Sequence, residues 1–206
     1  MHKKLLIVGA GGHGKVIADI AMNLNIYHEI VFLDDNIDKR TCMSCQVVGT
    51  LEDINNYISD HDIIIAIGNA NVRKKMMEDL IINKASIPTL IHPRAIIGAN
   101  VEFGCGTVVM AGAILNPDAK IGNGCIINTA ATVDHDCEIG DYVHISVGSH
   151  LAGNVKVNGS TWIGIGSTIS NNLSICDNVT IGAGAVVVKD IIESGTYVGV
   201  PAKKIK

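Results

Sequence analysis

A six-residue period runs through the second half of the chain and constrains its fold more than any other feature. Counting every sixth residue from Ile91 gives a large apolar side chain at each step as far as Val187. These anchors are Ile91, Ile97, Phe103, Val109, Leu115, Ile121, Ile127, Val133, Ile139, Ile145, Leu151, Val157, Ile163, Ile169, Ile175, Ile181 and Val187. The residue four positions after an anchor is mostly small or β-branched. Because a six-residue unit is too short to bury a core alone, the units must stack, which predicts a parallel β-helix.

The first 90 residues follow a different pattern, in which short apolar runs alternate with helical periods. We expect strands over 5–8, 30–33 and 63–67 and helices over 13–24 and 72–82, a combination typical of a small α/β unit with a parallel sheet. The apolar stripe of the first helix comprises Val16, Ile17, Ile20, Ala21 and Leu24. The sequence therefore predicts two domains, residues 1–90 and residues 91–206.

A glycine-rich loop, IVGAGGHGKV at residues 7–16, joins the first predicted strand to the first helix. Gly9, Gly11 and Gly14 match G-x-G-x-x-G, a spacing that lets backbone N–H groups approach a phosphate at a helix N-terminus. A full dinucleotide domain needs two βαβαβ halves, and 90 residues leave room for one. With Asp34 and Asp35 at the end of the next strand, the loop favours one nucleoside diphosphate rather than a dinucleotide such as NAD. The alternative is that the glycines only pack helix against strand.

Charge and hydropathy exclude several classes of partner. Sixteen Lys and Arg against 20 Asp and Glu give a net charge of −4, without a basic block, so nucleic acid is not an expected partner. No apolar run approaches membrane-spanning length and no secretory signal is present, so we expect a cytoplasmic protein with reduced thiols and no membrane partner. Cys42 and Cys45 form an isolated C-x-x-C to which no role is assigned.

The motif [LIV]-G-x-x-[STAV]-x over residues 91–192 resembles that of the hexapeptide-repeat left-handed β-helix proteins. The resemblance implies a left-handed β-helix with three hexapeptides per 18-residue coil, and a homotrimer with acyltransferase activity. The segment GTYVGVPAKKIK at residues 195–206 is similar to the end of hexapeptide acyltransferases, where a Gly-x-Pro-Ala-Lys stretch lines the coenzyme A site. Lys203 is the matching lysine, although a solvated terminal charge is an equal alternative.

His135, in TVDHDCEIG, is the candidate general base. It lies between two aspartates at an expected turn rather than at an inward anchor. Imidazole has the intrinsic pKa for removing a proton from an attacking amine or hydroxyl, and Asp136 could fix its tautomer. Gly153 is one 18-residue coil further on, where its N–H could polarise the thioester carbonyl and stabilise the oxyanion of the tetrahedral intermediate. The alternatives are a surface histidine among acids and a glycine that only turns a corner.

Six stretches resemble bacterial sugar acyltransferases, a group that includes sialic acid O-acetyltransferases and N-acetyltransferases of nucleotide-linked 4-amino sugars. They are GAGGHGKV, FLDD, AIGNANVRKK, LIHP, VDHDCEIGDYVHISVGSHLAGNVKV and GVPAKKI. The resemblance implies that His135 is the base, tuned by the following acid, which is commonly Glu and here the shorter Asp136. It implies that acetyl-CoA lies between two subunits against His144, Gly153, Ile165 and Ala183. It implies that the sugar nucleotide contacts Gly11, Gly12, His13, Asp34, Asp35 and Gly68.

The expected function is N-acetylation of a UDP- or GDP-linked 4-amino-4,6-dideoxy sugar for surface-glycan biosynthesis, with acetyl-CoA as cosubstrate and no metal. One alternative is O-acetylation of sialic acid. A more distant one is a zinc hydrolase similar to the γ-carbonic anhydrases, which would join His135, His144 and His150 across a subunit interface.

Overall fold

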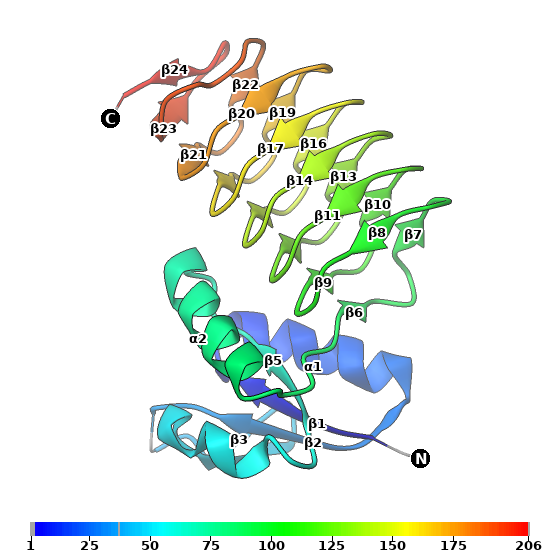
Figure 1. Ribbon diagram of the computed structural model, residues 1–206, viewed down its shortest axis with the longest axis vertical. Coiled ribbons are helices and arrows are strands. Elements are labelled where there is room, and N and C mark those ends of the chain that lie inside the picture. The colour runs from blue at the N-terminus through cyan, green and yellow to red at the C-terminus, as the bar shows by residue number, and fades with distance from the viewer. Residues whose placement is uncertain (1–2, 37, 206) are drawn as a thin grey trace. The chain divides into compact units, whose positions relative to one another are not determined.

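The computed structural model describes residues 3–36 and 38–205, which divide between Pro93 and Arg94 into two compact units (Figure 1). Within these ranges, no helix has both the length and the apolar character needed to cross a bilayer.

The first unit is built on a mainly parallel sheet with strand order β3-β4-β2-β1-β5. In chain order its elements are β1 (Lys3–Val8), α1 (Gly12–Leu24), β2 (Tyr27–Leu33), β3 (Thr41–Cys42), β4 (Cys45–Gly49), the 3-10 helix η1 (Leu51–Tyr57), β5 (Asp62–Ile65), α2 (Ala70–Ile82) and β6 (Leu90–Ile91). Strand β1 pairs in parallel with β2 and β5, and β3 pairs with β4 as an antiparallel hairpin. The predicted helices and strands are present with slightly different ends, whereas the hairpin and η1 are not anticipated by the sequence pattern.

Helix α1 begins after Gly11, whose backbone is extended, and ends at Asn25, which adopts the left-handed conformation. Its buried face consists of Gly14, Ile17, Ala18, Ile20 and Ala21. The expectation that Val16 belongs to this face is wrong, because the buried stripe is centred nearer Gly14 and Ala18 and leaves Val16 38% exposed.

The second unit is a parallel β-helix with three faces, whose coils stack successively from green through yellow to red in Figure 1. The first face comprises β7 (Ile96–Ile97), β10 (Ile114–Leu115), β13 (Thr132–Val133), β16 (His150–Leu151), β19 (Thr168–Ile169) and β22 (Val186–Val187). The second comprises β8 (Glu102–Phe103), β11 (Lys120–Ile121), β14 (Glu138–Ile139), β17 (Lys156–Val157) and β20 (Ser174–Ile175). The third comprises β9 (Val108–Val109), β12 (Ile126–Ile127), β15 (His144–Ile145), β18 (Trp162–Ile163) and β21 (Val179–Ile181), followed by β23 (Gly195–Val198) and β24 (Lys203–Lys204).

The predicted 18-residue coil is confirmed by the strand register. Ile114 pairs with Thr132, and Thr132 with His150, each one coil further on. In most strands the second residue is the apolar anchor, and the anchors from Val109 to Val187 are all buried. Ile97 is 36% exposed, because the first coil has a stacked coil on one side only.

A second six-residue period lies in the backbone. Every sixth residue from Asn100 to Gly184 has a φ between +54° and +71°, at the turn that ends each strand segment. Gly occupies many of these positions, but others hold Asn, Asp, Ala, Ser or Tyr. One of them is Asp136, so the turn geometry of the coil sets the direction of this carboxylate.

Candidate active site

His135 and Asp136 form a hydrogen-bonded pair at the corner between the first and second faces. Both lie in the turn that joins β13 to β14, and Nδ1 of His135 is 2.7 Å from Oδ2 of Asp136. Asp136 has a φ of 59°, which is the left-handed region that Asp tolerates better than most residues. The short aspartate side chain therefore reaches the adjacent ring.

Asp134 secures the same turn from the other side of His135. Its Oδ1 accepts the His135 backbone N–H at 2.8 Å and the Asn116 Nδ2–H at 2.7 Å. The Asn116 hydrogen bond, followed by that from His135, lowers the pKa of the Asp134 carboxyl. The hydrogen bond to Asp136 raises the pKa of His135 above its usual value, with smaller charge contributions from Asp134 and Asp136. With Nδ1 held by Asp136, Nε2 is the ring atom available to take a proton.

Gly153 lies directly against the His135 ring. A β-carbon built on Gly153 would stand 2.6 Å from both Nε2 and Cε1 of His135. The backbone confirms the predicted stacking, since the Asn154 N–H donates to the His135 carbonyl at 2.9 Å. Gly153 is buried, and within residues 3–36 and 38–205 its N–H donates to no acceptor. Only glycine fits here without moving the ring.

The residues expected to contact acetyl-CoA lie at three places in one chain. His144 and Lys203 lie in the sheet of the third face, on β15 and β24. Ile165 and Ala183 are one coil apart at the corner between the third and first faces, and both are exposed. His135 and Gly153 lie at the other edge of the first face. A single chain therefore does not gather the predicted catalytic and cofactor residues at one corner.

The three histidines of the zinc-hydrolase alternative are also dispersed. His144 is on the third face and His150 on the first, where they pair in register with Trp162 and Thr168. His150 Nδ1 lies 3.0 Å from the Thr132 hydroxyl. In the described part of the chain, no three His, Cys, Asp or Glu side chains come together in a way that could hold a metal ion.

In the first unit, the loop glycines have two distinct roles. A β-carbon on Gly14 would collide with the carbonyl oxygen of Gly9, so Gly14 is needed for close packing of α1. A β-carbon on Gly11, Gly12 or Gly68 would have no atom within 4 Å. These three glycines border open space beyond the carboxyl ends of β1 and β5, and half-buried His13 follows Gly12 on α1. This sheet edge is where α/β folds bind ligands.

Asp34 and Asp35 follow β2 at the same edge and are partly engaged by the backbone. Asp34 accepts the Ala10 N–H at 2.7 Å through Oδ2 and the Asn36 N–H at 2.9 Å through Oδ1. Asp35 accepts the Leu51 N–H at 3.0 Å. Each carboxylate oxygen has a second lone pair, so these bonds shape the loops while leaving acceptor capacity for a ligand.

Three further residues position these loops and were not identified from the sequence. The Lys39 ammonium and the Cys42 thiol both donate to the carbonyl of Ala10, the residue whose N–H is bound by Asp34, and so help to hold the glycine loop. Buried Arg73 donates through Nη1 to the carbonyls of Ile67, at 2.8 Å, and Gly68, at 2.9 Å. The partner of Lys39 and Cys42 lies 29 and 32 residues away in sequence, so no local pattern reveals these two contacts.

Cys42 and Cys45 lie opposite each other as paired residues of the β3–β4 hairpin. Met43 and Ser44 form its two-residue turn, both with positive φ, and both cysteines are free thiols. The C-x-x-C spacing thus matches a hairpin turn.

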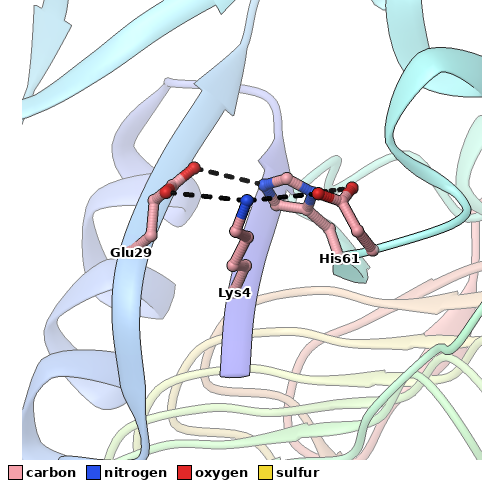
Figure 2. Close-up of polar contacts among 4 residues, drawn as sticks. Lys4, Glu29 and His61 are labelled. Carbon is pink, nitrogen blue, oxygen red and sulfur yellow. Dashed lines mark hydrogen bonds and ion pairs between the residues drawn. The ribbon is translucent and has the colours of Figure 1, made fainter. Parts of the chain in front are cut away.

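A charged cluster occupies the opposite, amino-terminal edge of the first unit's sheet (Figure 2). Buried His61 lies 2.7 Å from Asp60 through Nδ1 and 3.4 Å from Glu29 through Nε2. Lys4 lies 3.1 Å from Asp60 and 3.9 Å from Glu29. The cluster ties β1, β2 and the start of β5 together and is remote from the glycine loop.

Comparison with known proteins identifies relatives of both units. Residues 4–80 match the PglD N-terminal domain family. The chain is 38% identical over 112 residues to UDP-N-acetylbacillosamine N-acetyltransferase of Bacillus subtilis (strain 168). This alignment covers 53% of the chain and about half of that relative, 52% of its length.

Two solved structures match over nearly their full length. The acetyltransferase domain of PglB from Neisseria gonorrhoeae FA1090 in complex with acetyl coenzyme A is 41% identical, with a TM-score of 0.95 and 100% of both chains covered. PerB from Caulobacter crescentus in complex with CoA and GDP-perosamine is 32% identical, with a TM-score of 0.91, and the match covers 100% of this chain and 99% of PerB. The expected left-handed β-helix is confirmed. Given this agreement in sequence and fold, the chain belongs to the family of nucleotide-amino-sugar N-acetyltransferases.

Proposed function

We propose that this chain transfers the acetyl group of acetyl-CoA to the amine of a nucleotide-linked 4-amino-4,6-dideoxy sugar. The observation that carries the proposal is the His135 ring, held by Asp136 at 2.7 Å and seated against Gly153. An oriented base beside a backbone N–H that donates to no acceptor among the described residues is what acyl transfer to an amine requires. Support comes from relatives whose solved structures are complexes with acetyl coenzyme A and with CoA and GDP-perosamine.

In the proposed reaction the sugar amine attacks the thioester carbonyl carbon directly. His135 Nε2 removes a proton from the amine as the new C–N bond forms. The Gly153 N–H stabilises the oxyanion of the tetrahedral intermediate, which then collapses with cleavage of the C–S bond. Coenzyme A leaves as the thiolate and is protonated to the thiol. Asp136 keeps Nε2 free of hydrogen in the neutral imidazole and stabilises the imidazolium that forms.

We infer that the working unit is a homotrimer. His135 and Gly153 lie at one corner of the coil, and Ile165 and Ala183 at another. Acetyl-CoA contacts both groups if the second corner comes from a neighbouring subunit, because rotation of identical chains brings unlike corners together. The His135 side chain is 60% exposed in one chain. A neighbouring subunit would cover part of this side chain and so exclude water from the reaction.

The sugar nucleotide is assigned to the first unit. Gly11, Gly12 and Gly68 border open space at the carboxyl edge of the sheet, and Asp34 and Asp35 retain acceptor capacity for ribose or base N–H and O–H groups. A free sugar acceptor would not need such a loop. Lys203 on β24 and His144 on β15 are assigned to acetyl-CoA.

The experiment that tests this function has two stages. Calorimetry with UDP, GDP, CMP, NAD and acetyl-CoA identifies the ligands, and transfer to UDP- and GDP-linked 4-amino sugars is then followed by release of the CoA thiol. We expect UDP or GDP, together with acetyl-CoA, to bind and an amino sugar to be acetylated. If neither UDP nor GDP binds and a sialic acid is acetylated instead, O-acetylation is the function. Binding of NAD alone would overturn the assignment of the loop.

A further inference from the structure

Trp162 is the single tryptophan of the chain and its side chain points outward from the third face of the β-helix. It is the first residue of β18, next to the buried anchor Ile163, and is 52% exposed. A large aromatic side chain on a solvent-facing strand position is unusual enough to need an explanation. The register places it directly beside His144 of the preceding coil.

The two rings are stacked. Their centroids are 5.8 Å apart and their planes differ by 5°, which is an offset stack. The indole is itself held, because Nε1–H of Trp162 donates to Oγ of buried Ser146 at 2.6 Å. The stacked ring therefore fixes the plane of the imidazole.

Asn128 holds His144 from the coil on the other side. Its Nδ2 lies 3.2 Å from Nε2 of His144, and its Oδ1 accepts the Thr129 N–H at 2.8 Å. The bond to Thr129 sets the orientation of the amide, so that the NH₂ group faces the imidazole. Donation to Nε2 places the proton of the neutral ring on Nδ1. Three successive coils thus determine the plane and the tautomer of one histidine.

We propose that Trp162 is a positioning residue for acetyl-CoA binding, and that it acts by holding the imidazole of His144 in place. The inference rests on the proposed function through the assignment of His144 to the cofactor. A ring held in one orientation loses less conformational entropy when it binds acetyl-CoA than a mobile ring does, so removing the stack weakens binding.

The first measurement asks whether the stack exists in solution. Because Trp162 is the single tryptophan, intrinsic fluorescence reports this site alone, and a protonated imidazole in contact with indole quenches its emission. We expect emission of the wild-type protein to fall in a step at acid pH, and this step to be absent in His144→Gln. An identical pH profile in both proteins would overturn the stack.

The second measurement is calorimetric affinity for acetyl-CoA, which needs no acceptor sugar. We expect Trp162→Leu to raise the Kd about tenfold and Trp162→Phe, which keeps a stacking ring, to stay within about threefold of wild type. Lys120→Met, at an outward position of the second face, is the matched control and should leave the Kd unchanged. A wild-type Kd in Trp162→Leu would overturn the proposal.

A double-mutant cycle separates action through His144 from direct contact with the cofactor. In the His144→Gln background, Trp162→Leu should cause no further loss of affinity, because the ring that it positions is gone. Additive losses would show that Trp162 acts independently and would overturn the proposal. If acetyl-CoA binds as expected but no nucleotide amino sugar is acetylated, the proposed function fails while the role of Trp162 in cofactor binding is still decided by these affinities.

Discussion

The imidazole of His135 occupies the space that a side chain at Gly153 would fill. A β-carbon on Gly153 would lie 2.6 Å from Nε2, closer than any real carbon contact. We therefore expect Gly153→Ala to displace the ring and lower kcat by about two orders of magnitude or more, the range of general-base catalysis. Steady-state kinetics measures the loss.

The control for this substitution is Asn171→Ala, at the same turn position one coil further on and exposed. It should retain activity close to wild type. The loss in Gly153→Ala should occur without loss of the assembly, as judged by light scattering. Wild-type turnover in Gly153→Ala would show that catalysis does not depend on the close packing of His135 against Gly153.

Asp136 sets the pH range in which His135 acts as a base. Its hydrogen bond raises the pKa of His135, so kcat/KM should decline as the pH falls through this raised value and the base becomes protonated. Asp136→Asn removes the carboxylate yet tolerates the positive φ of 59°. The acid limb of the kcat/KM profile should therefore move to lower pH, together with a lower plateau. An unmoved acid limb would mean that another group controls it.

Gly12 and Gly14 should respond to alanine in opposite ways. A β-carbon on Gly14 meets the Gly9 carbonyl, so Gly14→Ala should lower the stability of the first unit by about 1–3 kcal/mol, as for other overpacked sites. A β-carbon on Gly12 meets nothing at the start of α1, so Gly12→Ala should leave stability unchanged or slightly increased.

Ligand affinity completes this comparison. If the loop binds the phosphates of a sugar nucleotide, Gly12→Ala should weaken UDP or GDP binding at least about fivefold, because the methyl group enters the space used by the ligand. Thermal unfolding and calorimetry on the same samples provide both readouts. An unchanged affinity of Gly12→Ala for UDP and GDP would show that the open space beside Gly12 does not bind the nucleotide.

A site shared between subunits can be tested by complementation. His135→Ala removes the base, and Ala183→Trp blocks the exposed corner assigned to acetyl-CoA. Each variant alone should be inactive, but co-expressed mixed trimers should recover about a quarter of wild-type activity, since a random interface joins two intact corners with that frequency. No recovery in mixed trimers verified by mass spectrometry would place the whole site within one chain.

Chelation distinguishes acetyl transfer from the zinc-hydrolase alternative. We expect full acetyl transfer after exhaustive treatment with a chelator, because His135 supplies the base and the Gly153 N–H stabilises the oxyanion. Elemental analysis should then detect no zinc. Loss of transfer on chelation, restored by added zinc, would instead support a metal bound between subunits by His135, His144 and His150.

The sequence alone determined the β-helix, because every sixth position requires a large apolar side chain that faces the core. One inward residue per hexapeptide and identical coil lengths also determined that Gly153 would lie beside His135. The pairing of Thr132 with His150 follows the same 18-residue arithmetic. Such predictions succeed because a stacked repeat depends on nearest neighbours.

Only the tertiary structure decided how the polar groups meet. The positive φ of Asp136 directs its carboxylate to His135, and a residue name does not reveal that conformation. Cys42 reaches the Ala10 carbonyl from the β3–β4 hairpin and Lys39 reaches it from the loop before that hairpin, and neither segment is part of a sequence repeat. These contacts depend on side-chain direction and on loops distant in the chain, whereas burial of apolar anchors depends on spacing alone. The spacing of the apolar anchors can be read directly from the sequence, whereas the direction of a polar side chain is determined only in the folded chain.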